Sequence, residues 1–267
     1  MRLDPVFLAT AIEAVLRAGD LQMARFGQPF EVSKKGRIDL VTDVDIEVER
    51  GVRRLLAERF PAHDVLAEEL DGGATHGSGF CWIFDPLDGT TNFAHGLPIF
   101  CSSLALEIDG QLEVAAVYDP WRRELFTAER GGGAFLNGGR LAVSDAPTLL
   151  ESLLVTGFPY DVHDPEVGAD VVGLFGAFIG KAQAVRRLGS AALDLCYVAA
   201  GRMDGFWEEH LKPWDVAAGA LLVREAGGRV TGLQGAPFDV RRASLVASNG
   251  VIHEAMVDVI HAFKTGS

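Results

Sequence analysis

Two apolar segments joined by Asp109-Gly110 constrain the fold more than any other feature of the chain. Residues 104–108 and 112–118 are both rich in strand-forming side chains. Asp-Gly suits the positive φ angles of a two-residue turn, so the pattern predicts an antiparallel hairpin. Repeated glycines mark further turns between residues 100 and 143. The middle of the chain is therefore predicted to form a sheet of short strands.

Helical periodicity flanks this strand-rich stretch. Apolar spacing predicts helices over residues 5–25 and through residue 56, the second capped by Asp43 or Asp45. Short strands are expected at 64–67 and 80–84. Beyond residue 151 we expect a helix over 191–200 capped by Ser190, a strand near 206–207, and helices over 214–226 and 251–263. We therefore expect one compact body in which helices pack on mixed or antiparallel sheets. It could also be described as two lobes, 1–150 and 151–267.

The charge balance limits the ligands that a chain like this can bind. Its 267 residues include 24 Lys and Arg against 37 Asp and Glu, which gives a formal net charge of −13. Nucleic acids are bound by a surplus of basic side chains, so we expect no direct nucleic-acid binding. An anionic small substrate would also be repelled unless metal cations reversed the sign of the charge locally.

The three cysteines, Cys81, Cys101 and Cys196, are widely spaced in apolar segments. This spacing indicates neither a disulfide framework nor a metal cluster, and it fits a reducing compartment. No signal peptide is apparent, and no apolar run approaches the ~18 to 20 residues of a membrane helix. The sequence therefore predicts a cytoplasmic protein without a membrane partner.

The segment from residue 82 to residue 93 is the most informative about chemistry. A predicted strand delivers Asp85 to its end, and Asp88-Gly89 then turns the chain so that the two carboxylates converge. The backbone N–H groups of Gly89 and Thr90 follow at the start of a predicted helix. Oxygen ligands beside free N–H groups suit a magnesium-assisted phosphate site, although the same residue types also form ordinary turns.

This segment resembles a signature of the inositol monophosphatase family, whose members are magnesium-dependent, lithium-sensitive phosphatases. Residues 214–219 resemble a second signature, and Ala67-Glu68-Glu69 and residues 39–42 resemble two shorter ones. The resemblance covers nearly the whole chain. It implies a single inositol monophosphatase-like domain over 1–267, with the α/β, layered αβαβα sandwich that fructose-1,6-bisphosphatases share, and commonly a homodimer.

The resemblance also implies a set of metal ligands. Glu68, Asp85 and the Leu87 carbonyl would hold one Mg²⁺, and Asp85, Asp88 and Asp215 would hold a second. A weaker third ion would be held with the help of Asp45 and Glu68, with Lys34 nearby. The five carboxylates carry five negative charges, so two Mg²⁺ leave −1. We therefore expect the third ion to arrive with the phosphate, and Li⁺ to inhibit.

Roles toward the substrate are implied in the same way. Glu68 and Thr90, with Asp45, would orient the attacking water, and the N–H groups of Gly89 and Thr90 would bind phosphate. The alcohol half would meet Asp88, the backbone of Ala191, and Glu208. The expected reaction is direct in-line attack by a metal-activated water, without a covalent phosphoenzyme.

Several of these residues also have simpler interpretations. Asp45 could only cap a helix, and Asp215 could only stabilise the positive end of one. Solvated surface charges are the alternative for Lys34, Glu68 and Glu208.

Other functions agree with only part of the sequence. Asp43-Val44-Asp45 has the spacing of a haloacid-dehalogenase nucleophile and acid, but that reading leaves the Asp85 and Asp215 motifs unexplained. The P-loop motif of nucleotide hydrolases is missing from the sequence. A regulatory binding protein is the non-catalytic alternative. Among substrates, residues 156–160 and 206–214 favour inositol monophosphate, with histidinol phosphate and fructose 1,6-bisphosphate as alternatives and adenosine bisphosphates disfavoured.

Overall fold

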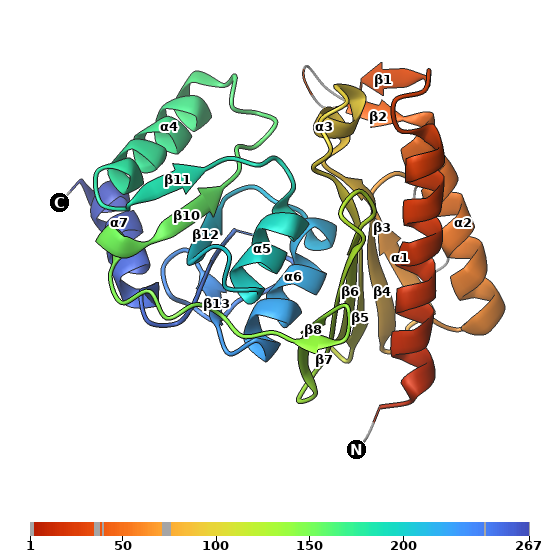
Figure 1. The fold of residues 1–267 in the computed structure, drawn as a ribbon. Helices are drawn as coiled ribbons and strands as arrows, with labels where there is room; N and C mark the ends of the chain where they lie inside the picture. The colour runs from red at the N-terminus through yellow and green to blue at the C-terminus, as the bar shows by residue number, and fades with distance from the viewer. Residues whose placement is uncertain (1–2, 35–37, 39, 71–75, 243, 267) are drawn as a thin grey trace.

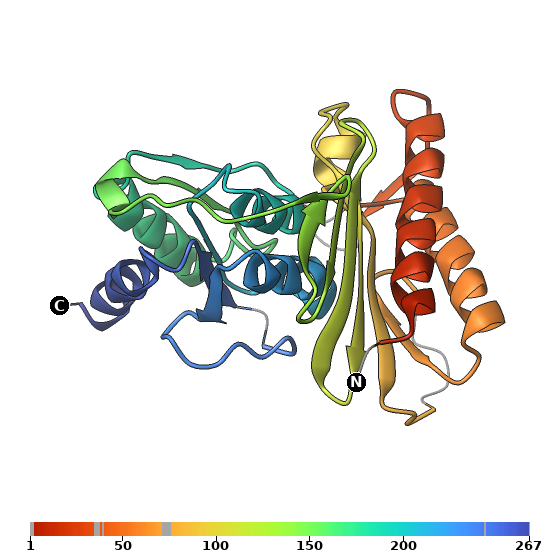
Figure 2. The ribbon, with the colours of Figure 1, turned by 60° about the horizontal axis from the view of Figure 1, so that its bottom comes forward.

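A computed structural model describes residues 3–34, 38, 40–70, 76–242 and 244–266. Its elements form five layers, in which helices and sheets alternate across the molecule (Figures 1 and 2). A seven-stranded and a five-stranded sheet sandwich one pair of helices, and each sheet carries a further pair on its outer face. The predicted αβαβα sandwich is therefore confirmed.

The first layer consists of α1 (Pro5–Arg25) and α2 (Asp43–Arg59), connected through the short strands β1 (Val32–Lys34) and β2 (Leu40–Thr42). The predicted helix over residues 5–25 is confirmed. The cap of α2 is Thr42 rather than Asp43 or Asp45, and its hydroxyl accepts a hydrogen bond from the Val44 N–H at 3.2 Å. Asp45 serves the same cap from within the helix, because its Oδ2 accepts the Thr42 N–H at 2.9 Å.

The seven-stranded sheet has the order β3-β4-β5-β6-β7-β8-β9, with only β3 and β4 parallel. Its strands are β3 (Asp64–Ala67), β4 (Phe80–Asp88), β5 (Cys101–Ile108), β6 (Gln111–Asp119), β7 (Glu124–Glu129), β8 (Gly133–Leu136) and β9 (Gly139–Arg140). The predicted hairpin joins β5 to β6, with φ values of 47° at Asp109 and 78° at Gly110. Strand β4 runs four residues past its predicted end at residue 84, and helix α3 (Thr90–Ala94) follows it.

The five-stranded sheet has the order β11-β10-β12-β14-β13 and is also mixed. Its strands are β10 (Leu153–Thr156), β11 (Ala184–Arg186), β12 (Gly205–Glu208), β13 (Arg229–Gly232) and β14 (Leu245–Ser248). The helices of this half are α4 (Pro165–Ile179), α5 (Ala191–Ala199), α6 (Pro213–Glu225) and α7 (His253–Thr265), with a 3-10 turn at Leu149–Glu151. The three predicted helices are thus confirmed to within two residues at each end.

Helices α5 and α6 fill the space between the two sheets (Figure 2). Every residue of α5 is buried, as expected for a helix that is covered on all sides. The two helices approach closely at Gly219, where an added Cβ would lie 2.5 Å from the Leu195 Cβ. No helix in the described part of the chain is long and apolar enough to span a membrane.

Candidate active site

One cavity of about 240 Å³ lies where the end of β4 meets the starts of α3, α5 and α6 and the end of β12. Most of the residues predicted for the site line it. They are Glu68, Asp85, Leu87, Asp88, Gly89, Thr90, Ala191, Glu208 and Asp215. Residues from four separate parts of the chain therefore meet in one place. Asp45 is the predicted site residue that does not line the cavity.

Asp85 is 2% exposed and sits at an irregularity of β4, because the pairing of β4 with β5 shifts register between Asp85 and Asp88. Its Oδ1 accepts the Leu87 N–H at 2.9 Å. The Pro86 carbonyl accepts hydrogen bonds from Gln22 Nε2 at 2.8 Å and from the Ser102 hydroxyl at 3.0 Å. These bonds hold the backbone between Asp85 and Asp88 in place. They therefore stabilise the turn that the sequence predicts to bring the two carboxylates together.

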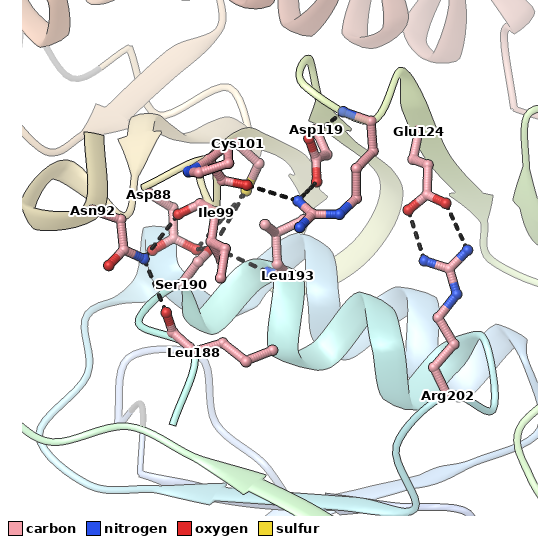
Figure 3. Close-up of polar contacts among 12 residues, drawn as sticks. Asp88, Asn92, Ile99, Cys101, Asp119, Glu124, Leu188, Ser190, Leu193 and Arg202 are labelled. Atoms are coloured by element: carbon pink, nitrogen blue, oxygen red, sulfur yellow. Dashed lines mark hydrogen bonds and ion pairs between the residues drawn. The ribbon is translucent and has the colours of Figure 1, made fainter. Parts of the chain in front are cut away.

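Asp88 connects β4 to the start of α5 (Figure 3). Its Oδ2 accepts the Ser190 hydroxyl and the Ala192 N–H, both at 2.7 Å. The Asn92 side-chain amide strengthens the same junction, donating to the Ile99 and Leu188 carbonyls at 2.9 Å each. The side chain of Asp88 is thereby fixed before any ligand binds.

Asp215 occupies the first turn of α6, and its Oδ2 accepts the Lys212 N–H at 2.7 Å. The carboxylate therefore does stabilise a helix start, as the simpler interpretation held. It also lines the cavity. The two roles coexist at this position.

Thr90 links the cavity to the buried Asp45. Its hydroxyl lies 2.9 Å from the Leu87 carbonyl and 3.1 Å from Asp45 Oδ1, and one hydroxyl proton can satisfy only one of these acceptors at a time. Asp45 is completely buried, and its Oδ2 accepts from both the backbone and the hydroxyl of Thr42. A metal-supporting role for Asp45 stays a prediction. Lys34 ends β1, and Asp39 lies outside the described residues.

The cavity carboxylates repel one another. Burial raises the pKa of Asp85 well above its ordinary value, and the charges of Glu68, Asp88 and Asp215 raise it further. Burial and the charge of Asp88 likewise raise the pKa of Asp215. Burial raises the pKa of Asp88 to about 6, against the opposing effect of the Ser190 hydrogen bond. A cation placed among these groups would relieve the repulsion.

The donor set fits magnesium. In the described residues, no three His, Cys, Asp or Glu side chains are arranged as a ready-made metal cage. Mg²⁺ does not need one, because it keeps several of its waters and binds through one or two carboxylates together with substrate phosphate. Carboxylates and the Leu87 carbonyl are the hard oxygen ligands that it prefers, and Asp85, Asp88 and Asp215 each engage one oxygen in the bonds described above.

Glu208 closes the cavity from the end of β12. It is 6% exposed, and burial raises its pKa to about 8 while the charge of Arg187 lowers it. Its carboxyl group lies directly against Gly157, where an added Cβ would come within 2.1 Å of Glu208 Oε2. Glu208 is therefore a buried residue of the cavity wall, so the sequence alternative of a solvated surface charge is wrong.

Sequence reasoning did not single out Arg187 or Asp194, and it named Gly157 only as part of the segment 156–160, although all three line the cavity. Arg187 is exposed and lies over the Phe158 ring, with its guanidinium carbon 5.8 Å from the ring centroid. Asp194 could have been found, because it is the acidic residue of a helix that is otherwise apolar. His210 also lines the cavity.

The haloacid-dehalogenase alternative finds no support in this arrangement. Asp43 forms an ion pair with Arg25 and does not line the cavity. Asp45 is buried with both oxygens engaged. Neither carboxylate is available to attack a phosphate in the cavity.

Comparison with known proteins agrees with the family resemblance that the sequence motifs indicate. Residues 4–264 match the inositol monophosphatase family. The chain is 42% identical over 259 residues to the Nus factor SuhB of Pseudomonas aeruginosa, covering 95% of each protein. It is 42% identical over 263 residues to the inositol-1-monophosphatase of Synechocystis, covering 96% of this chain and 89% of that protein. Its fold matches the crystal structure of extragenic suppressor protein suhB from Bartonella henselae with a TM-score of 0.90 and 39% identity, covering 96% and 98% of the two chains.

Proposed function

We propose that this chain hydrolyses a small polyol or sugar phosphate with the help of Mg²⁺. The chain belongs to the inositol monophosphatase family and is therefore a phosphatase that acts on phosphate monoesters. Inositol monophosphate is the first candidate substrate. The observation that carries the proposal is the meeting of Glu68, Asp85, Asp88 and Asp215 in one cavity. Four acidic groups around an anionic substrate make chemical sense only if cations lie between them.

The metal ligands follow from the cavity lining. Glu68, Asp85 and the Leu87 carbonyl would hold one Mg²⁺, and Asp85 would share a second with Asp88 and Asp215. When bound, Mg²⁺ lowers the pKa of water and neutralises charge on the phosphate. Li⁺ would compete for one of these positions.

The residues of the chain itself would supply orientation. The Thr90 hydroxyl and Glu68 would form hydrogen bonds with the attacking water and so orient it. Asp45 approaches the same hydroxyl from the buried side. The backbone N–H groups of Gly89 and Thr90, at the start of α3, would donate to phosphate oxygens. Gly89 has a φ of 97°, and an added Cβ would lie 2.7 Å from the Ile99 carbonyl, so this turn requires glycine.

The alcohol half of the substrate would contact the other wall residues of the cavity. Glu208 and Asp88 would accept hydrogen bonds from its hydroxyl groups, beside the backbone of Ala191. A carboxylate that has no donor among the described residues, as is the case for Glu208, is well suited to accept them from a polyol.

A substrate panel tests the proposal directly. Phosphate release would be measured from inositol 1-phosphate, fructose 1,6-bisphosphate, histidinol phosphate and 3′-phosphoadenosine 5′-phosphate, each with Mg²⁺, with EDTA and with added Li⁺. We expect inositol 1-phosphate to be cleaved fastest, only with Mg²⁺, and to be protected by Li⁺. Equal turnover in EDTA would contradict the metal dependence, and preference for another ester would correct the substrate.

A binding role is the second candidate, because a relative with 42% identity is named a Nus factor. Such a role would require a macromolecular partner and need not involve hydrolysis. The Asp215→Asn variant separates the two functions. If it loses phosphatase activity but still retains a stoichiometric partner from lysate, the chain has both roles.

Three further properties are proposed on the same basis. The chain would act as a single domain and form a homodimer in the cytoplasm, where its three cysteines stay free. Light scattering would give the mass of the particle, and calorimetry would show one unfolding transition. Two separate transitions would contradict the single domain.

A further inference from the structure

A bulge in β4 brings the carboxylates of Asp85 and Asp88 to the same face of the sheet. In a regular strand, side chains three positions apart point to opposite faces. Here Asp85 pairs with Ser103 of β5. Asp88 pairs with Cys101, so three steps along β4 match two steps along β5. The extra residue lets both carboxylates line the cavity, and the proposed sharing of a metal ion therefore depends on this bulge.

The Pro86 carbonyl, inside the bulge, is held by two side chains from the face of the sheet that α1 covers (Figure 2). Neither Pro86 nor Leu87 is paired with a residue of β3 or β5. Gln22 Nε2 of α1 donates to the Pro86 carbonyl at 2.8 Å, and the Ser102 hydroxyl of β5 donates to it at 3.0 Å. Gln22 Nε2 also donates to the Ser102 hydroxyl oxygen at 2.9 Å, which closes a ring of three hydrogen bonds.

Gln22 lies on a face of α1 that is mostly apolar. The other buried residues of the helix are Thr10, Ala11, Ala14, Val15, Ala18 and Gly19. Gln22 is completely buried, and its Oε1 has no hydrogen-bond partner among the described residues. The amide cannot be turned round to satisfy this oxygen, because the Pro86 and Cys101 carbonyls beside Nε2 only accept. The helix therefore keeps a buried polar group at a cost in stability, and the donors of that group are directed at the bulge.

We propose that Gln22, together with Ser102, is a positioning residue for the metal ligands, and that it fixes the bulge by holding the Pro86 carbonyl. It acts through the backbone, because neither Gln22 nor Ser102 belongs to the cavity lining. Ligands that are held in place before an ion binds lose less conformational freedom on binding, so the bulge raises the affinity for Mg²⁺. This role rests on the proposed function, since it requires Asp85 and Asp88 to bind Mg²⁺.

Binding of Mg²⁺ alone tests the inference without recourse to catalysis. Calorimetry would compare the Kd for Mg²⁺ of the wild type with that of Gln22→Met, whose side chain has the same length but no N–H donor. We expect the Kd to rise about tenfold, which corresponds to the net contribution of about one hydrogen bond. An unchanged Kd would overturn the inference, because a residue that only supports the fold would lower the stability alone.

Thr10→Val on the same helix is the matched control. Thr10 is also completely buried, lies about three turns from Gln22 along α1, and accepts a hydrogen bond from Arg59 Nη1 at 3.0 Å. Both variants should lower the Tm in EDTA, but the Kd of Thr10→Val for Mg²⁺ should stay within about twofold of the wild-type value. A rise as large as that of Gln22→Met would overturn the inference, because general loosening of α1 would then explain both results.

Ser102→Ala decides the question if Gln22→Met does not fold. It removes the other donor to the Pro86 carbonyl by a smaller change and should also raise the Kd for Mg²⁺ several-fold. An unchanged Kd in this variant would overturn the inference. If the wild type binds Mg²⁺ but releases phosphate from no ester of the panel, the proposed function fails, and the comparison of Kd values still decides the role of Gln22.

Discussion

The Ser190 hydroxyl donates to Asp88 Oδ2 across 2.7 Å and so joins the end of β4 to the start of α5 (Figure 3). The two residues are 102 positions apart in the chain. The same hydroxyl oxygen accepts the Leu193 N–H at 3.4 Å and caps α5. One small side chain therefore supports both a helix and a carboxylate that we propose as a metal ligand.

Replacing this hydroxyl tests the relationship. Ser190→Ala should raise the pKa of Asp88, because the Ser190 hydrogen bond opposes the effect of burial, and should weaken Mg²⁺ activation several-fold. Loss of the cap should also cost about 1 kcal/mol of stability. Ser190→Thr keeps the hydroxyl and should restore both properties. An alanine variant with unchanged Mg²⁺ dependence would show that the bond does not serve the metal site.

Replacement of a proposed metal-ligating residue should have the largest effect on kcat. Asp85→Asn and Asp215→Asn should each lower kcat at least a hundredfold, since each neutral amide leaves an ion with one anionic ligand fewer. Asp109→Asn is the matched control, because Asp109 lies in the β5–β6 turn at a φ of 47° that asparagine also adopts. Near-normal turnover in either ligand variant would refute the site.

Gly157 should be intolerant of any side chain. In Gly157→Ala the new Cβ would come within 2.1 Å of Glu208 Oε2, so the carboxyl group must move. We expect a KM for inositol 1-phosphate raised about tenfold with kcat less affected. Gly176→Ala in α4 is the control, since nothing lies within 4 Å of an added Cβ there. Equal kinetics for the two variants would contradict the placement of Glu208.

The stability of the metal-free protein should fall as the pH rises. The pKa of Glu208 is raised from 4.5 to about 8 and that of Asp88 from 3.8 to about 6, in both cases chiefly by burial. Groups with a raised pKa in the native state hold their protons longer than in the unfolded state, so their stabilising contribution is lost as the pH rises through these values. The Tm in EDTA should therefore drop between pH 5 and pH 8.

Two comparisons separate this effect from general repulsion by the net charge. Glu208→Gln should flatten the decline of Tm with pH, because its side chain does not ionise. Mg²⁺ should raise the Tm more at pH 8 than at pH 5, since only ionised ligands bind the cation. A Tm in EDTA that rises with pH would contradict the assignment of these raised pKa values.

Local sequence patterns were sufficient to predict the structure where it depends on residues that are close together in the chain. The Asp109-Gly110 hairpin followed from turn chemistry alone. The cap of α2 shows the limit of such signals, because Thr42, Asp43 and Asp45 are all good capping residues and only the structure shows Thr42 at the cap. The layer order came from the family resemblance rather than from periodicity.

The alcohol side of the cavity could not be predicted in the same way. Gly157 and Glu208 come together because β10 and β12 pair side by side, which no local pattern specifies. The sequence alone does not show that Asp194 is unpartnered, because only the burial of α5 between two sheets leaves its oxygens without partners among the described residues. The proposed metal ligands could be predicted because they stand in short motifs that resemble the family's signatures.

The most direct test of the account is a calorimetric titration of the wild-type chain with Mg²⁺, with and without inorganic phosphate. Glu68, Asp85, Asp88 and Asp215 line the cavity in which the phosphate would bind, so we predict two ions per subunit without phosphate and a third with it. Asp215→Asn should lose at least one of them. A single Mg²⁺ per subunit in the presence of phosphate would contradict the shared metal site on which the proposed hydrolysis depends.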